Sequence, residues 1–329
     1  FLGIIAALFL SYFDYQVYTK FWPVIAVFCV IIMLVLFKWG TGPSSRPDAR
    51  TWLSIGPINF QPSELVKIGF IITFGVHLDK VKEKINNIFS ILQLGAHAAV
   101  PIVLVAATGD MGSALVFMVI AIVMMFVAGV HWGYFLGGIA LVGAATPLIW
   151  TYVLKQLQKD RFLALIYPDL YPDIIYQQQR GLNAIGAGGI TGQGLFKGAY
   201  TQAGAVPESQ NDMIFSVVGE ELGFIGCITA LLLIVLITVR IIYVGKKSSE
   251  QSTNLICTGM AAMIIGQMII NVGMCLMLLP VIGITLPFFS AGGSSNLCVY
   301  LGIGIVMSIY RHNCDTGAVN IRVYDSLKK

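Results

Sequence analysis

The sequence predicts an all-α polytopic membrane protein that crosses a bilayer about ten times in full, with nine spans visible in this chain. Hydrophobic residues make up 57% of the 329 residues and charged residues only 11%, whereas a soluble protein carries about 25% charged residues. The mean hydropathy is +0.82. Long apolar runs recur throughout, and most approach the roughly 20 residues that span a bilayer as a helix.

The apolar runs follow one another with short polar breaks. They lie at 1–13, 21–39, 61–78, 93–108, 112–130, 132–153, 213–244, 253–279 and 293–311. Phe1 stands inside the first run, without a Met or a charged leader, so we expect one further helix upstream. We therefore interpret residues 1–329 as a single transmembrane domain.

Basic residues gather in alternate connections, which orients the predicted helices. They are Lys20, Lys80, Lys82, Lys84, Lys246, Lys247, Arg311, Arg322, Lys328 and Lys329. The positive-inside rule makes their side cytoplasmic. The segments 40–60, 108–111, 154–211 and 280–292 then lie on the external side.

The external loop 154–211, between the spans 132–153 and 213–244, is too long for a simple connection, and loops of this size are usually functional. It contains aromatic and aliphatic residues such as Phe162 and Tyr176. We expect it to form short helices at the membrane surface.

The segment 49–67 places charges at a membrane boundary. Arg50 and Trp52 suit the interface, and Pro62 suits the first turn of a helix. Glu64 and Lys67 share a helix face at i, i+3 spacing. They are either a neutralised ion pair or a site in which Lys67 or Arg50 holds an anionic headgroup.

Asp110 stands in the short turn 108–112. Because Asp is a favoured N-cap residue, it is expected either to cap the following helix or to face a polar cavity and pair with Arg50 or Lys67.

Two glycine-rich segments adjoin membrane boundaries. Segment 184–198 is either a flexible re-entrant turn or a cradle of backbone N–H groups for phosphate. Segment 285–296 is expected to be non-helical and to line a cavity, since irregular backbone at membrane depth must be buried or wet.

Asp212 immediately precedes the long run 213–244, and its spacing fits a helix cap and a catalytic acid equally well. Glu220 and Glu221 point about 100° apart on a helix. We therefore expect that they do not share one partner, and that one of them meets a cation or backbone amides.

Several functions are disfavoured by the composition. The net charge of +4 says nothing about nucleic acid, and no nucleic-acid partner is expected. The six cysteines have no CxxC spacing and no accompanying histidine cluster, so we expect neither a disulfide nor a cysteine metal site. No arrangement typical of a nucleophilic triad is visible among the four scattered histidines.

Five segments together resemble the SEDS family (shape, elongation, division and sporulation). They are QPSELVK (61–67), GDMGSALVF (109–117), AIGAGGITGQG (184–194), VPESQNDMIFSVVGEELGFIG (206–226) and LPFFSAGGSS (286–295). Residues 184–186 and Thr201-Gln202 are more similar to the elongation branch, RodA, than to the division branch, FtsW.

The resemblance implies a ten-helix glycosyltransferase of the bacterial cell membrane, with its active site on the extracellular face. Such an enzyme polymerises lipid II into glycan strands for cell-wall elongation and cell shape, and it releases undecaprenyl pyrophosphate. Its implied partner is a class B penicillin-binding protein, which supplies transpeptidation. The rival interpretations are a flippase for lipid-linked precursors and a non-catalytic scaffold.

The resemblance also assigns residues. The family's essential carboxylate falls on Asp212, its Glu/Lys helix pair on Glu64 and Lys67, its turn acid on Asp110, and its arginine before tryptophan on Arg50. We expect Asp212 to act as a general base or as a ligand of a divalent cation, Mg²⁺ or Mn²⁺. Glu208, Ser294 and Ser295 complete the candidate substrate contacts.

Overall fold

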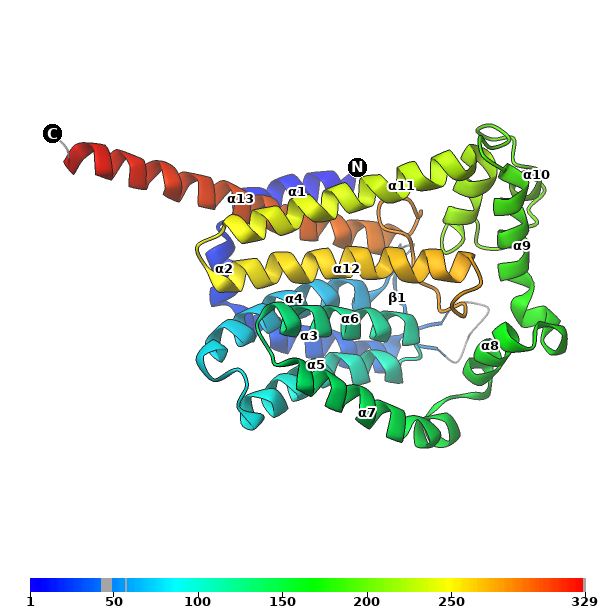
Figure 1. Ribbon diagram of the computed structural model, residues 1–329, viewed down its shortest axis with the longest axis horizontal. Helices are drawn as coiled ribbons and strands as arrows, with labels where there is room; N and C mark the ends of the chain where they lie inside the picture. Colours follow the sequence, from blue (N-terminus) through cyan, green and yellow to red (C-terminus); the bar gives the residue numbers. More distant parts are fainter. Residues whose placement is uncertain (43–48, 57, 328–329) are drawn as a thin grey trace. The chain divides into compact units, whose positions relative to one another are not determined.

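The computed structural model describes residues 1–42, 49–56 and 58–327, which are mostly helical (Figure 1). Two compact units can be distinguished. The first unit comprises Phe1–Val130, Ile237–Ile264 and Gly293–Lys329, and the second comprises His131–Leu236 and Ile265–Gly292. The interpretation as one transmembrane domain stays a prediction.

All nine predicted apolar runs form helices. They are α1 (Leu2–Tyr12), α3 (Trp22–Trp39), α4 (Pro62–Lys80), α5 (Ile88–Ala107), α6 (Met111–Val127), α7 (Trp132–Leu148), α11 (Ile214–Lys247), α12 (Gln251–Cys275) and α13 (Gly293–Leu327). Six described helices are long and apolar enough to cross a membrane, and α1 and α6 are shorter apolar helices. The chain is a multi-pass membrane protein.

Short elements connect these helices. In the first unit they are α2 (Tyr15–Lys20) and η1 (Lys82–Lys84), and in the second η2 (Ile149–Val153) directly extends α7. The large loop holds α8 (Gln156–Ile166), η3 (Pro168–Leu170), α9 (Pro172–Gly188) and α10 (Ala199–Gln202). The short helices expected in this loop are therefore confirmed, and their place at the membrane surface stays a prediction.

A small β-hairpin precedes α4, where the sequence predicted no strand. Its strands β1 (Leu53–Ile55) and β2 (Ile58–Phe60) are antiparallel, with Leu53 opposite Phe60. Gly56 in the connection has φ +61°, a conformation that glycine adopts without steric cost. A run of three residues per strand is too short for alternation to be recognised in the sequence.

Helix α4 is the centre of the first unit. It packs against α2, α3, α5, α6 and α13, and most of its side chains are buried, from Pro62 at its start to Leu78 near its end. A helix that is enclosed on nearly all sides needs no polar face. Its central position buries Glu64 and Lys67, the two charged residues of its first two turns.

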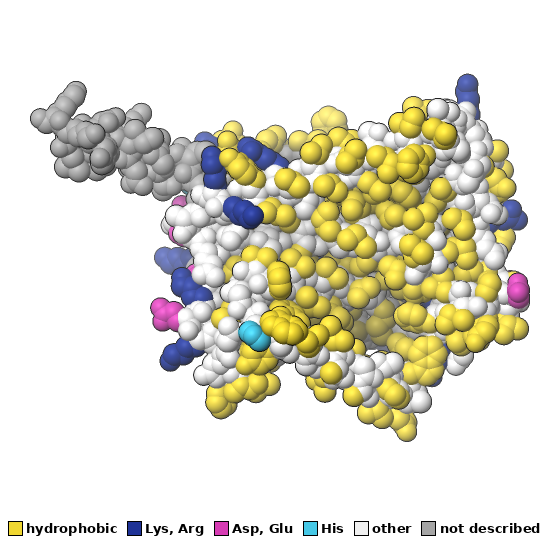
Figure 2. Space-filling view, viewed as in Figure 1, with side chains coloured by type: hydrophobic (Ala, Val, Ile, Leu, Met, Phe, Trp, Pro, Cys, Tyr) yellow, Lys and Arg dark blue, Asp and Glu magenta, His cyan; other side chains and the backbone are white. Residues whose placement is uncertain are grey.

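Exposed basic side chains gather at one end of the first unit's helices, while the flanks are hydrophobic (Figure 2). Lys80 ends α4, Lys84 ends η1, and Lys246 and Lys247 end α11, and all four are exposed. The predicted gathering of these lysines is confirmed, and the assignment of their side to the cytoplasm stays a prediction.

Candidate functional site

The first unit contains a buried ion pair. Lys67 Nζ lies 2.8 Å from Glu64 Oε1, and the two side chains are 0% and 6% exposed. Glu64 stands in the first turn of α4, where the unpaired N–H groups of the helix start favour a negative charge. The predicted i, i+3 pair is therefore confirmed.

Asp110 is buried and caps α6, since its Oδ1 accepts a hydrogen bond from Ser113 N at 3.0 Å. Its Oδ2 accepts from Gln61 Nε2 at 2.9 Å and from Ser63 Oγ at 3.1 Å. Asp110 takes part in neither of the ion pairs Lys67–Glu64 and Lys82–Asp79. The capping interpretation is thus confirmed, and the proposed ion pair of Asp110 with Arg50 or Lys67 is not formed.

Arg50 joins the ends of two helices. Its backbone N donates to the carbonyl of Thr108, after α5, at 2.9 Å, and its guanidinium donates to the carbonyl of Phe37 in α3. Gly40 lies beside it, and a Cβ there would meet the Leu36 carbonyl oxygen at 2.3 Å and the Arg50 Cβ at 3.0 Å. The side chain is exposed, which leaves part of its positive charge available to an anion.

Ser294 and Ser295 lie in the first turn of α13, and both are buried. Ser294 Oγ accepts from Gln61 N at 3.2 Å and donates to Asn59 O at 3.3 Å. Gln61 thus ties both Ser294 and Asp110 to the start of α4. Residues 285–292 are non-helical, as expected, but the expectation for residues 285–296 is wrong at 293–296, which form the first turn of α13.

The second unit contains Asp212, which is partly exposed and stands two residues before the start of α11 at Ile214. Met213 therefore occupies the N-cap position. The backbone carbonyl of Asp212 accepts a hydrogen bond from Asn271 Nδ2 at 2.8 Å. Asn271 is fully buried and also donates to Ile284 O at 2.7 Å.

Hydrogen bonds also fix the backbone carbonyls of the two residues that precede Asp212. Ser290 Oγ donates to Asn211 O at 2.7 Å, and Ala291 N donates to Gln210 O at 2.8 Å. Sequence reasoning missed Asn271, and it included Ser290 only as part of the segment 285–296. An asparagine inside the apolar run 253–279 was the only available signal, since a buried amide needs partners.

Glu208 also lies in this segment, at φ +51°. Its Oε2 accepts from Asn211 Nδ2 at 2.9 Å, and its carbonyl accepts from Asn211 N at 3.0 Å and Met213 N at 3.1 Å. These contacts shape the turn that presents Asp212.

The two adjacent acids of α11 bind backbone amides of the large loop. Glu220 accepts from Tyr200 N at 2.6 Å and from Thr201 N and Oγ1 at 3.0 and 2.5 Å. Glu221 accepts from Phe196 N at 3.0 Å. The expectation that the two acids do not share one partner is confirmed, because Glu220 binds residues 200 and 201 whereas Glu221 binds Phe196 and Gln202, and both acids meet backbone amides.

The glycine-rich segment forms hydrogen bonds with the backbone groups that a break in α11 leaves without helical partners. Gly223 has non-helical angles, φ 66° and ψ −165°. The carbonyls of Glu220 and Glu221 accept from Gln193 N and Gly194 N, while Phe224 N and Ile225 N donate to the carbonyls of residues 189 and 190. These amides are occupied by the protein itself, so the phosphate-cradle interpretation is not supported, and the re-entrant turn stays a prediction.

The carboxylates near Asp212 suit a metal site completed by substrate phosphates rather than one built only from protein ligands. Among the described residues, no group of three or more His, Cys, Asp or Glu is arranged to hold a metal ion. Mg²⁺ is commonly bound by one or two carboxylates together with substrate phosphates. Asp212, partly exposed, fits the first of these roles.

Comparison with known proteins identifies relatives along nearly the whole chain. Residues 1–315 match the family described as "Cell cycle protein", FtsW/RodA/SpoVE. The peptidoglycan glycosyltransferase MrdB of Escherichia coli K12 is 28% identical over 314 residues, covering 94% of this chain and 83% of that protein. A probable peptidoglycan glycosyltransferase FtsW of Geobacter sp. M18 is 32% identical over 303 residues, covering 90% and 80%.

Two further relatives extend this comparison. Stage V sporulation protein E of Bacillus subtilis is 31% identical over 323 residues, covering 95% of this chain and 85% of that protein. A chain from a peptidoglycan synthase complex that coordinates polymerization and crosslinking superposes with a TM-score of 0.81 at 26% identity, covering 95% and 87%.

RodA of Thermus thermophilus superposes with a TM-score of 0.70 at 24% identity, covering 95% of this chain and 85% of that one. At this identity the likeness concerns the fold alone, which is that of a RodA-like polytopic protein.

Proposed function

Because this chain belongs to the FtsW/RodA/SpoVE family, the SEDS proteins, we propose that it is a peptidoglycan glycosyltransferase that polymerises lipid II into glycan strands for cell-wall elongation. The relatives named for this activity match over at least 90% of the chain. The observation that carries the proposal is Asp212, a partly exposed carboxylate whose backbone is held by the buried Asn271.

Polymerisation requires two bonds to form and two to break. The acceptor sugar hydroxyl loses its proton, its oxygen bonds to the anomeric carbon of the donor, and the bond from that carbon to the lipid pyrophosphate breaks. Asp212 acts as general base and takes the hydroxyl proton, a role for which a positioned carboxylate contributes about 10²–10⁴-fold. Undecaprenyl pyrophosphate leaves with the bonding electron pair.

The departing pyrophosphate needs positive charge. Lys67 and Arg50 supply it, and Glu64 orients the Lys67 ammonium at 2.8 Å. Asp110 acts indirectly, through the hydrogen bond to Gln61 that organises the start of α4. Glu208, Ser294 and Ser295 are polar side chains suited to sugar hydroxyls, and we assign them to substrate binding.

In the alternative to the general-base role, Asp212 would hold a divalent cation, Mg²⁺ or Mn²⁺, together with the substrate phosphates. When bound, it supplies positive charge to the pyrophosphate. Lipid II and growing glycan lie outside the cytoplasm, so we place Asp212 on the extracellular face of the cell membrane. A class B penicillin-binding protein is the proposed partner, supported by the likeness to a chain of a synthase complex.

The test is an assay of the purified full chain, with its penicillin-binding partner, given lipid II and Mg²⁺. Wild type is expected to produce glycan chains, and Asp212→Asn is expected to lose at least about 100-fold of the rate. The matched control is Asp169→Asn, which changes an exposed carboxylate elsewhere in the large loop and is expected to leave the rate unchanged.

Three results would contradict the assignment. Undiminished polymer from Asp212→Asn excludes Asp212 as the base. Movement of lipid II across vesicles without any polymer indicates a flippase. Polymer that depends only on the partner indicates a scaffold.

A further inference from the structure

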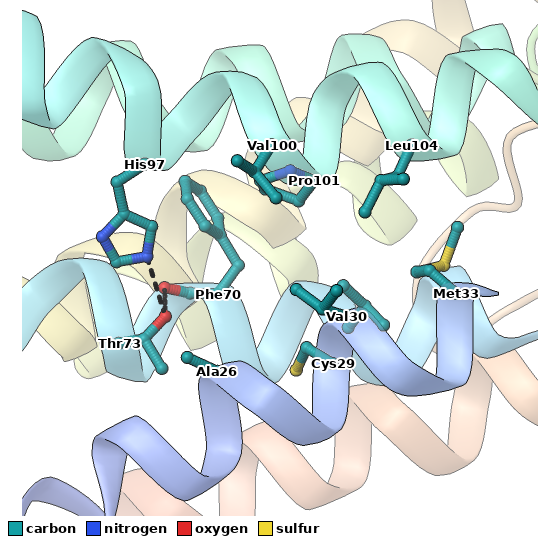
Figure 3. A pocket seen from close by; sticks show the side chains of 11 residues that line it. Ala26, Cys29, Val30, Met33, Phe70, Thr73, His97, Val100, Pro101 and Leu104 are labelled. Carbon is teal, nitrogen blue, oxygen red and sulfur yellow. Dashed lines mark hydrogen bonds between the residues drawn. The ribbon is translucent and has the colours of Figure 1, made fainter.

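The first unit contains an apolar cavity of about 140 Å³ between α3, α4 and α5 (Figure 3). Side chains of α3 and α5 face each other across it, and α4 forms its floor. It is lined by Ala26, Cys29, Val30, Met33, Val66, Phe70, Thr73, His97, Val100, Pro101 and Leu104. None of the candidate catalytic residues is among them.

The packing of the three helices explains the cavity. Helix α3 packs mainly against α4 and touches α5 little, and two of the α3 side chains that face the gap, Ala26 and Cys29, are small. Val100 is 47% exposed, so the cavity is accessible from the side on which lipid chains lie.

The cavity presents carbon rather than polar atoms, although Thr73 and His97 line it. Thr73 Oγ1 donates to Phe70 O at 3.1 Å and contacts His97 Nε2 at 3.3 Å. The other ring nitrogen, His97 Nδ1, lies 2.9 Å from His77 Nδ1. Because these polar atoms satisfy one another, water gains little there, and apolar cavities of about 150 Å³ stay dry and accept apolar ligands.

The end of the cavity near Thr73 leads toward a basic, aromatic rim. Trp22 stands one turn before Ala26 on α3, and Lys80 stands two turns after Thr73 on α4. Lys80 Nζ lies 4.4 Å from the centre of the Trp22 ring. Lys82 is neutralised by Asp79, whereas Lys80 forms no ion pair among the described residues.

We propose that this cavity binds the terminal part of one acyl chain of an anionic phospholipid from the leaflet on the Lys80 side, with Lys80 and Trp22 at its headgroup. Basic pockets between transmembrane helices bind anionic headgroups, and tryptophan favours the headgroup level.

The length of the site matches one leaflet. From Lys80 to Val66 is 14 residues of α4, or about 21 Å at 1.5 Å per residue. Half of a bilayer with its headgroups is about 20–22 Å, so an acyl chain entering at Lys80 ends where the cavity ends. A much longer polyprenyl chain does not match this length.

The site is separate from the proposed substrate contacts. Val66, Phe70 and Thr73 share one face of α4, and at 100° per residue Lys67 and Glu64 point about 90° and 150° away from it. The lipid is therefore a second ligand, bound apart from the lipid substrate, and the inference stands without the proposed enzymatic function.

The experiment is native mass spectrometry of the full chain, released from vesicles of phosphatidylglycerol or of phosphatidylcholine. Wild type is expected to retain one phosphatidylglycerol and no phosphatidylcholine. Ala26→Phe fills the cavity and is expected to abolish retention. Val27→Phe, one residue further along α3 on a 59% exposed position, is the matched control and is expected to retain the lipid.

The headgroup is tested with Lys80→Gln, which is expected to weaken retention about fivefold, the effect of one cation near an anionic surface. Lys84→Gln, an exposed lysine of the same cluster, is the control and is expected to match wild type. Retention that Ala26→Phe leaves unchanged overturns the cavity as the site. Equal retention of the two phospholipids, or displacement by equimolar undecaprenyl phosphate, overturns the anionic phospholipid as its ligand.

Discussion

Asn271 Nδ2 donates a hydrogen bond of 2.8 Å to the backbone carbonyl of Asp212, so a fully buried amide of α12 positions the chain at the proposed general base. A second hydrogen bond, of 2.7 Å, ties the same amide to Ile284 O. One side chain thus fixes the turn before α11 and the non-helical segment before α13 to the same helix.

Asn271→Leu is expected to leave the carbonyls of Asp212 and Ile284 without their donor and to lower the free energy of unfolding by about 2 kcal/mol or more. Because a shift of about 1 Å in a catalytic group costs about 10²-fold, we expect kcat to fall by that factor while KM changes little. Thermal melting and steady-state polymerisation measure the two effects.

The matched control is Gln267→Leu, one turn earlier on α12. Gln267 is also fully buried, but its amide atoms have no hydrogen-bond partner among the described residues. Removing such an amide is neutral or stabilising. Equal losses from the two variants contradict the specific role of Asn271.

Lys67→Met is expected to destabilise the protein by about 3–5 kcal/mol, because it leaves the Glu64 carboxylate buried without its cation. The double variant Glu64→Gln/Lys67→Met is expected to recover most of the stability and none of the polymerisation. Lys82→Met, which breaks the exposed pair with Asp79, is expected to cost less than about 1 kcal/mol. Recovery of activity in the double variant excludes Lys67 from substrate binding.

Gly223→Ala is expected to prevent stable folding. Gly223 has φ +66°, and a Cβ there would lie 2.4 Å from Gly192 N and 2.5 Å from Ile190 O. Gly186→Ala, at a position of α9 where a Cβ meets no atom within 4 Å, is expected to be tolerated or to stabilise by up to about 1 kcal/mol. The yield of folded protein and its melting temperature distinguish them, and similar yields of the two variants contradict the close approach at Gly223.

The hydrogen bonds of His77 and His97 predict their tautomers when both rings are neutral. The Thr73 hydroxyl donates its one proton to Phe70 O, so His97 Nε2 must be the donor to Thr73 Oγ1. His97 Nδ1 is then the acceptor, and His77 Nδ1 carries the proton between them.

Nitrogen-15 NMR of the protein in bilayers is expected to show protonated Nδ1 in His77 and protonated Nε2 in His97. Thr73→Val removes the acceptor for His97 and is expected to weaken its preference. Protonated Nε2 in both wild-type histidines is the result that contradicts this arrangement.

Local signals predicted much of the fold. Apolar runs near 20 residues identified nine of the helices, because a helix that satisfies its own backbone is the natural way for such a run to cross hydrocarbon. The i, i+3 spacing of Glu64 and Lys67 predicted their contact for the same reason, since it depends on one helix only. The hairpin 53–60 was missed because its strands are too short to show a pattern.

The sequence by itself thus determined the membrane class, the helices and the ion pair, all of which arise within a single stretch of chain. The tertiary structure alone decided that Gln61 and Ser63 donate hydrogen bonds to Asp110, and that residues 189–194 satisfy the break at Gly223. It alone also decided that Asn271 holds Asp212, 59 positions away. These contacts join segments distant in sequence, and buried polar groups find their partners only when such segments pack together.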